Sequence, residues 1–281
     1  MTEKHGTAAF RAYFLIIYCE RVDLMKFGIC IGAAHFEVAA RCGFSYVEPS
    51  AAAMRALDKA ALREVRAKAD AAGLTIEGYN GYFDGSVSLY NDTLERIAEY
   101  ARGNMALTET LGGNYFVFGS GGPRAVPKGM ERERAEERLL QVADVLGAEA
   151  AAAGAEIAVE PLRYAESNIL NTLEETVRFC RKLGRPNVRP LVDVFHFYMN
   201  GESVDDFKLL EPGELVHVHV ARPEPDRAAP GPEDVDALRP YAEAIRGAGY
   251  CGRVSLECAW PKGFDIDTAA NAVSALNAAF N

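Results

Sequence analysis

The chain repeats one pattern along most of its length: a short apolar run, rich in β-branched and aromatic residues, followed by a segment with helical spacing. The runs lie at 26–32, 46–50, 74–82, 114–120, 156–162, 188–195, 215–221 and 253–259. They recur about every 32 residues, which is the length of one strand with its crossover helix. This repeat constrains the fold strongly, because strands that are joined by helices run parallel in one sheet.

The segments between the runs carry apolar residues at intervals of three and four, among charged residues, which is typical of a helix with one buried face. Two such stripes are Leu62, Val65, Ala69, Ala72 and Ala135, Leu139, Val142, Leu146. Eight strand–helix units close naturally into a (β/α)₈ barrel. An open doubly wound sheet is the alternative, but it more often carries a GxGxxG turn after its first strand, and residues 28–37 contain none. We therefore predict a single (β/α)₈ TIM barrel.

The first residues of the chain do not fit the repeat. We expect the barrel domain to occupy 25–281 and residues 1–24 to be an extension outside the core fold. The apolar stretch 12–19 is far shorter than a membrane span, and no small-residue cleavage site follows it. We therefore expect no membrane association.

Composition narrows the class of partner and the compartment. The formal net charge is −10 and basic tracts are absent from the sequence, which disfavours a nucleic acid as partner. The cysteines are Cys19, Cys30, Cys42, Cys180, Cys251 and Cys258, and none forms a CxxC pair. We expect reduced, mostly buried thiols in a cytoplasmic protein.

Polar residues stand near the ends of the last four predicted strands, one on each strand: Glu160, Asp193, His219 and Glu257. In a (β/α)₈ barrel the carboxyl ends of the strands meet at one mouth, where chemistry takes place. Three converging carboxylates with no balancing Lys or Arg on those strands would repel one another, and a divalent cation removes that repulsion. This donor set suits Mn²⁺, Mg²⁺, Co²⁺ or Zn²⁺, and we expect one ion, Mn²⁺ first among them.

Histidines cluster in the same part of the chain. Three of the five histidines fall between 196 and 219. His217 and His219 are two apart in a strand, so they share a face. We expect His219, nearer the mouth, to be a metal ligand and His217, one layer deeper, to support the ligands. The alternative is that both are hydrogen-bonded core residues.

Four segments resemble the sugar phosphate isomerase/epimerase proteins of the xylose isomerase-like barrel superfamily, and within it the ketose 3-epimerases of the D-tagatose and D-psicose type. They are AVEPLRYAESNILNT (158–172), LVDVFHFYMNGE (191–202), VHVHVA (216–221) and SLEC (255–258). The resemblance covers about 25–281. It implies a Glu, Asp, His, Glu set around one divalent metal, matched here by Glu160, Asp193, His219 and Glu257. It also implies that Glu160 and Glu257 act as acid and base on a sugar.

The resemblance extends to residues that contact substrate hydroxyls. It implies this role for Glu166, for His196 and for an arginine in the loop after the ligand histidine. Arg227 is the best match for that arginine, with Arg222 as a competitor, because the loop 221–231 is longer than the family pattern. Relatives often form dimers or tetramers, so we expect a homo-oligomer.

The expected reaction is proton transfer beside a ketone through an enediolate, most simply C3 epimerisation of a ketose or ketose phosphate. Three alternatives remain open: an inosose-type dehydratase with the same four residues, an endonuclease, which acidic charge and few histidines disfavour, and a non-catalytic sugar-binding barrel. Elsewhere, Glu48 and 78–83 are expected at the same mouth or in turns and core. The glycine-rich loop 118–129, with Arg124 and Lys128, could hold a phosphate or act as a lid, and Trp260 could pack on a sugar or in the core.

Overall fold

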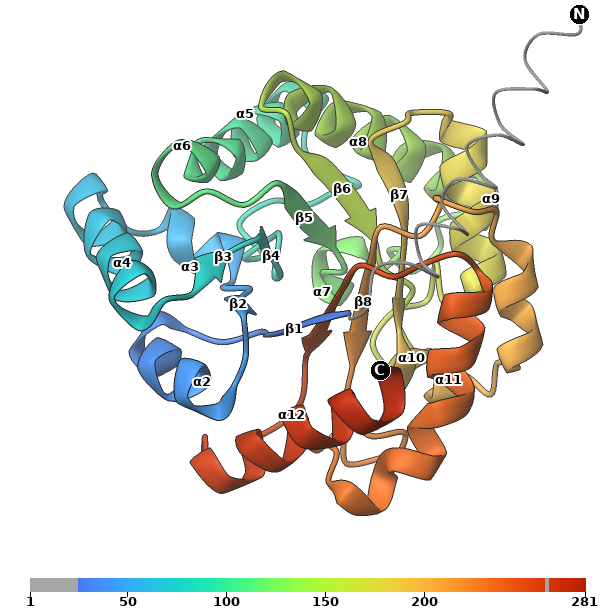
Figure 1. The fold of residues 1–281 in the computed structure, drawn as a ribbon. Helices are drawn as coiled ribbons and strands as arrows, with labels where there is room; N and C mark the ends of the chain where they lie inside the picture. The colour runs from blue at the N-terminus through green and yellow to red at the C-terminus, as the bar shows by residue number, and fades with distance from the viewer. Residues whose placement is uncertain (1–24, 261–262) are drawn as a thin grey trace, which may run out of the picture.

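The computed structural model describes residues 25–260 and 263–281, so the predicted extension 1–24 lies outside the described residues. Parallel strands form the inside of the molecule and helices surround them (Figure 1). The strands are β1 (Lys26–Ile29), β2 (Tyr46–Val47), β3 (Thr75–Ile76), β4 (Gly78–Tyr79), β5 (Tyr115–Phe118), β6 (Glu156–Val159), β7 (Val188–Asp193), β8 (His217–Val220) and β9 (Arg253–Leu256). The α-helices are α2 (Phe36–Cys42), α3 (Ala51–Arg55), α4 (Lys59–Ala72), α5 (Leu94–Met105), α6 (Leu107–Leu111), α7 (Gly121–Arg124), α8 (Arg132–Ala152), α9 (Leu173–Leu183), α10 (Val194–Met199), α11 (Val235–Gly247) and α12 (Ile266–Phe280). Short 3₁₀ helices are η1 (Ala33–His35), η2 (Val204–Leu209) and η3 (Pro232–Asp234).

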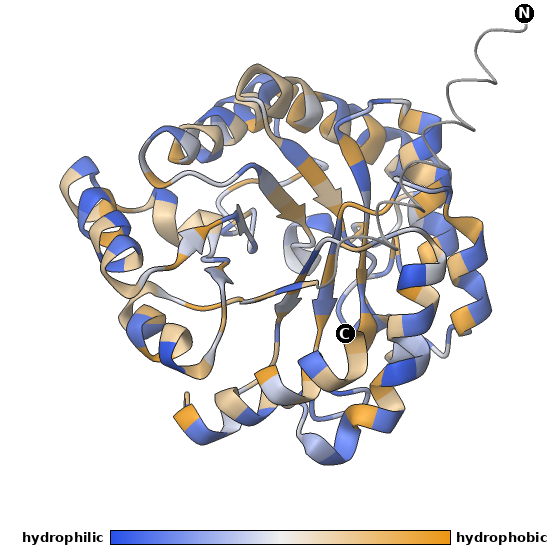
Figure 2. Ribbon diagram, viewed as in Figure 1, coloured by the Kyte–Doolittle hydropathy of each residue, from blue (hydrophilic) through white to orange (hydrophobic). Residues whose placement is uncertain are grey.

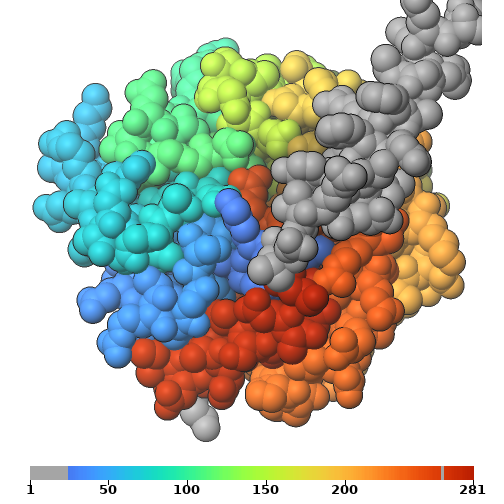
Figure 3. Space-filling view, in the orientation of Figure 1, coloured from blue at the N-terminus to red at the C-terminus, as the bar shows by residue number. Residues whose placement is uncertain are grey.

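The strand order confirms the predicted barrel. The order is β3-β2-β1-β9-β8-β7-β6-β5-β4, so the first strand lies between β2 and the last strand. The backbone N–H of Met25 donates to the side-chain oxygen of Asn281, which joins the first and last described residues at 2.9 Å. Figure 3 shows the corresponding blue and red segments side by side on the surface. The first and last strands of the described chain are therefore neighbours, as a barrel requires.

The third predicted strand is two short strands, which raises the number of strands in the described sheet to nine. Glu77 separates β3 from β4 and connects the two ends of the sheet. Its N–H donates to the carbonyl of Val47 on one side, and its carbonyl accepts from Asn114 on the other. The single predicted strand 74–82 is therefore wrong in detail, because the backbone changes partner at one residue in the middle of the run.

The two predicted apolar stripes face the core, but only the stripe of α8 is fully buried, since Leu62 and Ala72 of α4 are partly exposed. Ala135, Leu139, Val142 and Leu146 of α8 are all fully buried. Burying a Leu or Val side chain completely stabilises the fold by roughly 1.5–3 kcal/mol, so each stripe fastens its helix to the sheet. Figure 2 shows helices that carry both hydrophobic and hydrophilic residues, as expected when each helix packs one face on the sheet and exposes the other to solvent. The helix α4 ends at Gly73 (φ 70°), where a left-handed backbone favours glycine.

Two tyrosines lie inside the barrel, where glycines make room for them. Gly28 is the registered partner of Tyr46, and Gly78 is the registered partner of Tyr115. A Cβ on Gly28 would lie 2.1 Å from the Tyr46 ring, and one on Gly78 would lie 2.2 Å from the Tyr115 ring. Each tyrosine ring therefore packs against the glycine of the neighbouring strand, and its hydroxyl points into the barrel.

The expectation of reduced cysteines holds for four of the described residues. Cys30, Cys42, Cys180 and Cys258 are free thiols, and burial raises the pKa of Cys180 and Cys258. The expectation is wrong for Cys251, which is disulfide-bonded. Cys19 lies outside the described residues.

Candidate active site

The four residues expected to bind a metal come together at the carboxyl ends of four neighbouring strands. Glu160 follows β6, Asp193 ends β7, His219 lies in β8 and Glu257 follows β9. One donor atom from each lies within 4.8 Å of the others, and we call these residues the quartet. Asp193 and His219 are fully buried, and Glu160 is 4% exposed. Such a group of oxygen donors with one imidazole fits a divalent cation.

Direct contacts hold the quartet together. The Nδ1 atom of His219 lies 3.2 Å from Oε1 of Glu160 and 3.1 Å from Oε2 of Glu257. The guanidinium of Arg227 donates to Oδ2 of Asp193 (2.9 Å) and to Oε2 of Glu257 (2.5 Å). One imidazole and one guanidinium therefore face three carboxylates, an excess of negative charge that a metal ion would neutralise.

The two glutamates of the quartet differ in proton affinity. Burial and the neighbouring charge of Glu257 raise the pKa of Glu160. Burial alone would also raise the pKa of Glu257, but His219 and Arg227 outweigh it and lower that pKa to about 2. Two carboxylates whose pKa values are pushed apart are suited to act as an acid and a base.

Of the two competing arginines, Arg227 is the one that reaches the quartet. Its backbone is left-handed (φ 51°), and its carbonyl accepts a hydrogen bond of 2.7 Å from Ala259. This contact ties the loop after β8 to the segment after β9 and directs the side chain inward. Arg222 instead pairs with Asp226 at 2.6 Å near the surface. Its competing assignment therefore has no support in the contacts.

Of the two other expected substrate contacts, His196 lies beside the quartet. It is 1% exposed, its Nε2 lies 3.6 Å from Oδ2 of Asp193, and its Nδ1 has no hydrogen-bond partner. Glu166 accepts from Arg163 at 2.6 Å, so its carboxylate is engaged by a neighbour three residues away. The expected role of both residues stays a prediction.

His217 does not belong to the quartet. Its Nε2 lies 3.1 Å from Oε2 of Glu48. Burial lowers the pKa of His217 to about 4, so the ring is neutral at physiological pH. The expected supporting role of His217 stays a prediction, and its hydrogen-bond partner is Glu48, a residue expected at the mouth or in turns and core.

Glu48 is a fully buried carboxylate that meets several side chains inside the barrel. Its Oε1 lies 3.0 Å from Nε2 of His219, and its Oε2 accepts from Tyr115 (3.0 Å) and Ser255 (2.8 Å). Burial opposes ionisation, but His219 and His217 outweigh it and hold the pKa of Glu48 well below its usual range. The sequence signal for this residue was its place directly after the second strand.

A second group of possible metal donors shares His219 with the quartet. It consists of Cys30, Glu48 and His219. The Sγ atom of Cys30 lies 3.8 Å from Nε2 of His219, the same nitrogen that faces Glu48. Since a carboxylate only accepts hydrogen bonds, this nitrogen carries a proton, and the group is best described as a hydrogen-bond network.

The glycine-rich loop after β5 supports the quartet. A Cβ on Gly119 would lie 1.8 Å from Oε2 of Glu160, so only a glycine leaves room for that carboxylate. The Arg124 guanidinium is fully buried and donates to the carbonyls of Phe118 (3.1 Å) and Glu160 (2.8 Å). Arg124 thus holds the ends of β5 and β6 together, and its buried position gives no support to the phosphate hypothesis for this loop.

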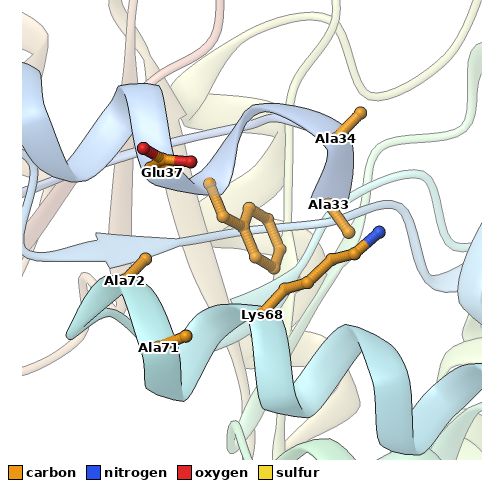
Figure 4. A pocket seen from close by; sticks show the side chains of 7 residues that line it. Ala33, Ala34, Glu37, Lys68, Ala71 and Ala72 are labelled. Carbon is orange, nitrogen blue, oxygen red and sulfur yellow. The ribbon is translucent and has the colours of Figure 1, made fainter.

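A pocket on the outside of the barrel has a different character. It lies between η1, α2 and α4 and is lined by Ala33, Ala34, Phe36, Glu37, Lys68, Ala71 and Ala72 (Figure 4). Figure 4 shows Lys68 extended toward Ala33. The lining offers mainly methyl groups and an aromatic ring, without converging donors, so we place the functional site at the quartet. Among the described residues, no helix is both long enough and apolar enough to cross a membrane.

Comparison with known proteins gives an independent account of the chain. The model of the xylose isomerase-like TIM barrel family matches residues 36–279. A D-psicose 3-epimerase of Agrobacterium fabrum is 27% identical over 253 residues, which is 85% of this chain and 82% of the relative. A D-psicose 3-epimerase of Ruminiclostridium cellulolyticum is 24% identical over 237 residues, with 79% and 76% covered. A crystal structure of D-psicose 3-epimerase in the presence of D-fructose superposes with a TM-score of 0.79 at 20% identity, covering 91% of this chain and 99% of that one.

Proposed function

The chain belongs to the xylose isomerase-like TIM barrel family, and from this premise we propose that it is a divalent-metal-dependent carbohydrate epimerase. The reaction we propose is epimerisation of a ketose or ketose phosphate at C3. The observation that carries the proposal is the quartet: four donor atoms from four neighbouring strand ends within 4.8 Å, two of them on glutamates. Similarity to relatives named D-psicose 3-epimerase supports the choice of reaction.

In this proposal the ion is held by Glu160, Asp193, His219 and Glu257. When bound, it would act as a Lewis acid on a carbonyl oxygen and the neighbouring hydroxyl of the sugar. Mn²⁺ is the ion we expect, with Mg²⁺, Co²⁺ or Zn²⁺ as alternatives. The donor set fits such an ion because three carboxylates lie close together with one arginine, Arg227, to balance them.

The glutamates move the proton. One carboxylate removes the hydrogen from the carbon beside the ketone, which leaves an enediolate, and the other delivers a proton to the opposite face of the same carbon. Glu160 and Glu257 come from β6 and β9, which lie on either side of β7 and β8, so they can approach a sugar from two sides. General acid–base catalysis of this kind contributes on the order of 10²–10⁴-fold to the rate.

The remaining polar residues at the mouth would orient the sugar. We propose that His196, Glu166 and Arg227 bind its hydroxyls. The unpartnered Nδ1 of His196 is buried and free to accept or donate such a bond. The ion pair of Glu166 with Arg163 holds that carboxylate in place. The choice among sugars would then depend on these three side chains.

A direct test is epimer formation. The purified protein is incubated with Mn²⁺ and a panel of free and phosphorylated ketoses, and products are separated by chromatography, with EDTA as control. We expect a C3 epimer that approaches equilibrium from either side and does not form with EDTA. Loss of water from an inosose would favour the dehydratase. An unchanged sugar, with metal bound, would favour a non-catalytic sugar-binding barrel.

We also propose a cytoplasmic homo-oligomer, a dimer or tetramer, with no nucleic-acid partner. Light scattering behind size-exclusion chromatography measures the oligomeric state, and a monomeric mass would refute the proposal. Cell fractionation measures the location.

A further inference from the structure

We propose that Glu48 is the positioning residue of the metal centre, because it fixes the orientation and tautomer of His219 from inside the barrel. The inference rests on the proposed metal site and goes beyond it, since Glu48 is not a member of the quartet. Two of its contacts matter most. Oε1 has His219 as its hydrogen-bond partner. Oε2 forms the hydrogen bonds with Tyr115, Ser255 and His217 that hold the carboxylate in place.

The two nitrogens of His219 face different carboxylates. Nδ1 faces the carboxylates of Glu160 and Glu257, and Nε2 faces Oε1 of Glu48 at 3.0 Å. An ionised carboxylate can only accept hydrogen bonds, so without a metal both ring nitrogens can carry a hydrogen. A cation held by the quartet would take the place of the hydrogen on Nδ1, while Glu48 keeps the hydrogen on Nε2. Nδ1 is then left with its lone pair directed at the quartet, which is the form that binds a metal.

Glu48 is itself held from three other strands. Its Oε2 accepts from Tyr115 of β5 and from Ser255 of β9, and it lies 3.1 Å from Nε2 of His217. The Tyr46 hydroxyl lies 2.9 Å from the Ser255 hydroxyl and extends the network to β2. With no exposure to solvent and both oxygens engaged, the carboxylate has little freedom to turn, and neither has His219.

The barrel's sequence is adapted to this network. Tyr115 reaches Glu48 because its ring lies over Gly78, where any Cβ would collide at 2.2 Å. Tyr46 reaches Ser255 for the same reason, through Gly28. Among the described residues, the side-chain hydrogen bonds of Tyr46, Tyr115 and Ser255 do not go to the quartet, so the network explains buried hydroxyls that the proposed proton transfer does not use.

The test compares metal binding in three proteins. Isothermal titration with Mn²⁺ is carried out on the wild-type chain, on Glu48→Gln and on Tyr115→Phe. Glu48→Gln keeps the size of the side chain but loses its charge, and its amide can present a donor to Nε2 of His219. We expect 10- to 100-fold weaker binding, the range for such supporting groups. Tyr115→Phe removes one bond to Oε2 and leaves Oε1 on His219, so we expect a change of less than about threefold.

A spectroscopic measurement separates positioning from general damage to the fold. Long-range ¹H–¹⁵N spectra of ¹⁵N-histidine protein, metal-free and with Zn²⁺, report which nitrogen of His219 carries the hydrogen. With Zn²⁺ bound, we expect a hydrogen on Nε2 and none on Nδ1 in the wild type, and a loss of this preference in Glu48→Gln; the metal-free wild type is the reference. A Zn²⁺-loaded wild type with the hydrogen on Nδ1 and the ion on Nε2 would overturn the inference, even if Glu48→Gln does not fold.

The outcomes also separate this inference from the proposed function. If Glu48→Gln binds Mn²⁺ as tightly as the wild-type chain does, the proposed role of Glu48 is overturned, while the metal site itself is retained. A wild-type chain that binds none of Mn²⁺, Mg²⁺, Co²⁺ and Zn²⁺ would overturn both.

Discussion

Gly119→Ala is a sharp perturbation of the metal site, because it moves a proposed ligand without changing it. The new Cβ would lie 1.8 Å from Oε2 of Glu160, 2.9 Å from its Cδ and 3.2 Å from its Cβ. An ordinary contact requires at least 3.4 Å, so the oxygen must move by roughly 1.5 Å. Metal–oxygen bonds in such sites are about 2.0–2.2 Å long, and a displacement of this size breaks one of them.

The expected cost follows from the loss of one ligand. Disturbing a residue that only supports a ligand weakens binding by about 10–100-fold, so we expect about 100-fold for the displaced ligand itself. This corresponds to about 2.7 kcal/mol. Because a ligand that binds the folded state stabilises it by mass action, the metal-induced rise in Tm should fall by about 5–8 °C in a chain of this size.

The assay is calorimetric titration with Mn²⁺, followed by thermal melts with and without the ion. Gly122→Ala is the matched control, because it lies three residues further along the chain, in α7, and its new Cβ meets nothing within 4 Å. We expect Gly122→Ala to bind like the wild type. A Gly119→Ala protein that also binds like the wild type would refute the placement of Glu160 as a ligand. The double variant Glu160→Ala/Gly119→Ala should bind Mn²⁺ no more weakly than Glu160→Ala alone, since both substitutions remove the bond between Glu160 and the ion.

Three further predictions concern the same molecule. Glu160→Gln and Glu257→Gln should each lower kcat by at least about 100-fold with the fold retained, and a near-normal rate in either would remove the two-carboxylate mechanism. His219→Ala should lose bound metal in calorimetry and His217→Ala should weaken binding less, because His217 forms its hydrogen bond with Glu48 rather than with the quartet; equal losses would contradict this ranking. Burial raises the pKa of Glu202 to about 7, so this group stabilises the fold below about pH 4.5 and its contribution is lost as the pH rises to 7. Glu202→Gln should therefore reduce the difference in unfolding free energy between pH 5 and pH 8 by about 2 kcal/mol in urea titrations, and an unchanged difference would contradict the shift.

The sequence predicts the barrel well because its repeat is regular. The strand–helix period sets the topology, and the stripe from Ala135 to Leu146 identifies the buried face of α8. The change of partner at Glu77 could not be predicted in this way, since strands of two residues are too short to show a period. Only the pairing of Glu77 with Val47 and Asn114 shows where the sheet closes.

Some residues of the candidate site could also be predicted from the sequence, and others could not. Glu160, Asp193, His219 and Glu257 could be located from their places near strand ends, because parallel strands bring those ends together. Glu48 has a comparable place after the second strand, but its partners come from strands far along the chain. The sequence therefore gives no sign that its two oxygens serve different residues.

The directions of loop side chains could not be predicted from the sequence, because a loop has no period that fixes them. Arg227 is the better match from the sequence, but Arg222 in the same loop competes with it. The hydrogen bond between Arg227 and Ala259 decides between them, and it joins two loops that are distant in sequence. Similarly, the sequence allows Arg124 to bind a phosphate, whereas its guanidinium is buried against the carbonyls of Phe118 and Glu160.

The most direct test of the central claim is hydrogen exchange between solvent and sugar. The protein is incubated in D₂O with Mn²⁺ and a panel of free and phosphorylated ketoses, with EDTA as control, and deuterium on carbon is located by NMR and mass spectrometry. The proposed proton transfer predicts metal-dependent deuterium at C3 of one sugar and of its epimer. Metal-loaded protein that places no deuterium on any ketose would contradict it.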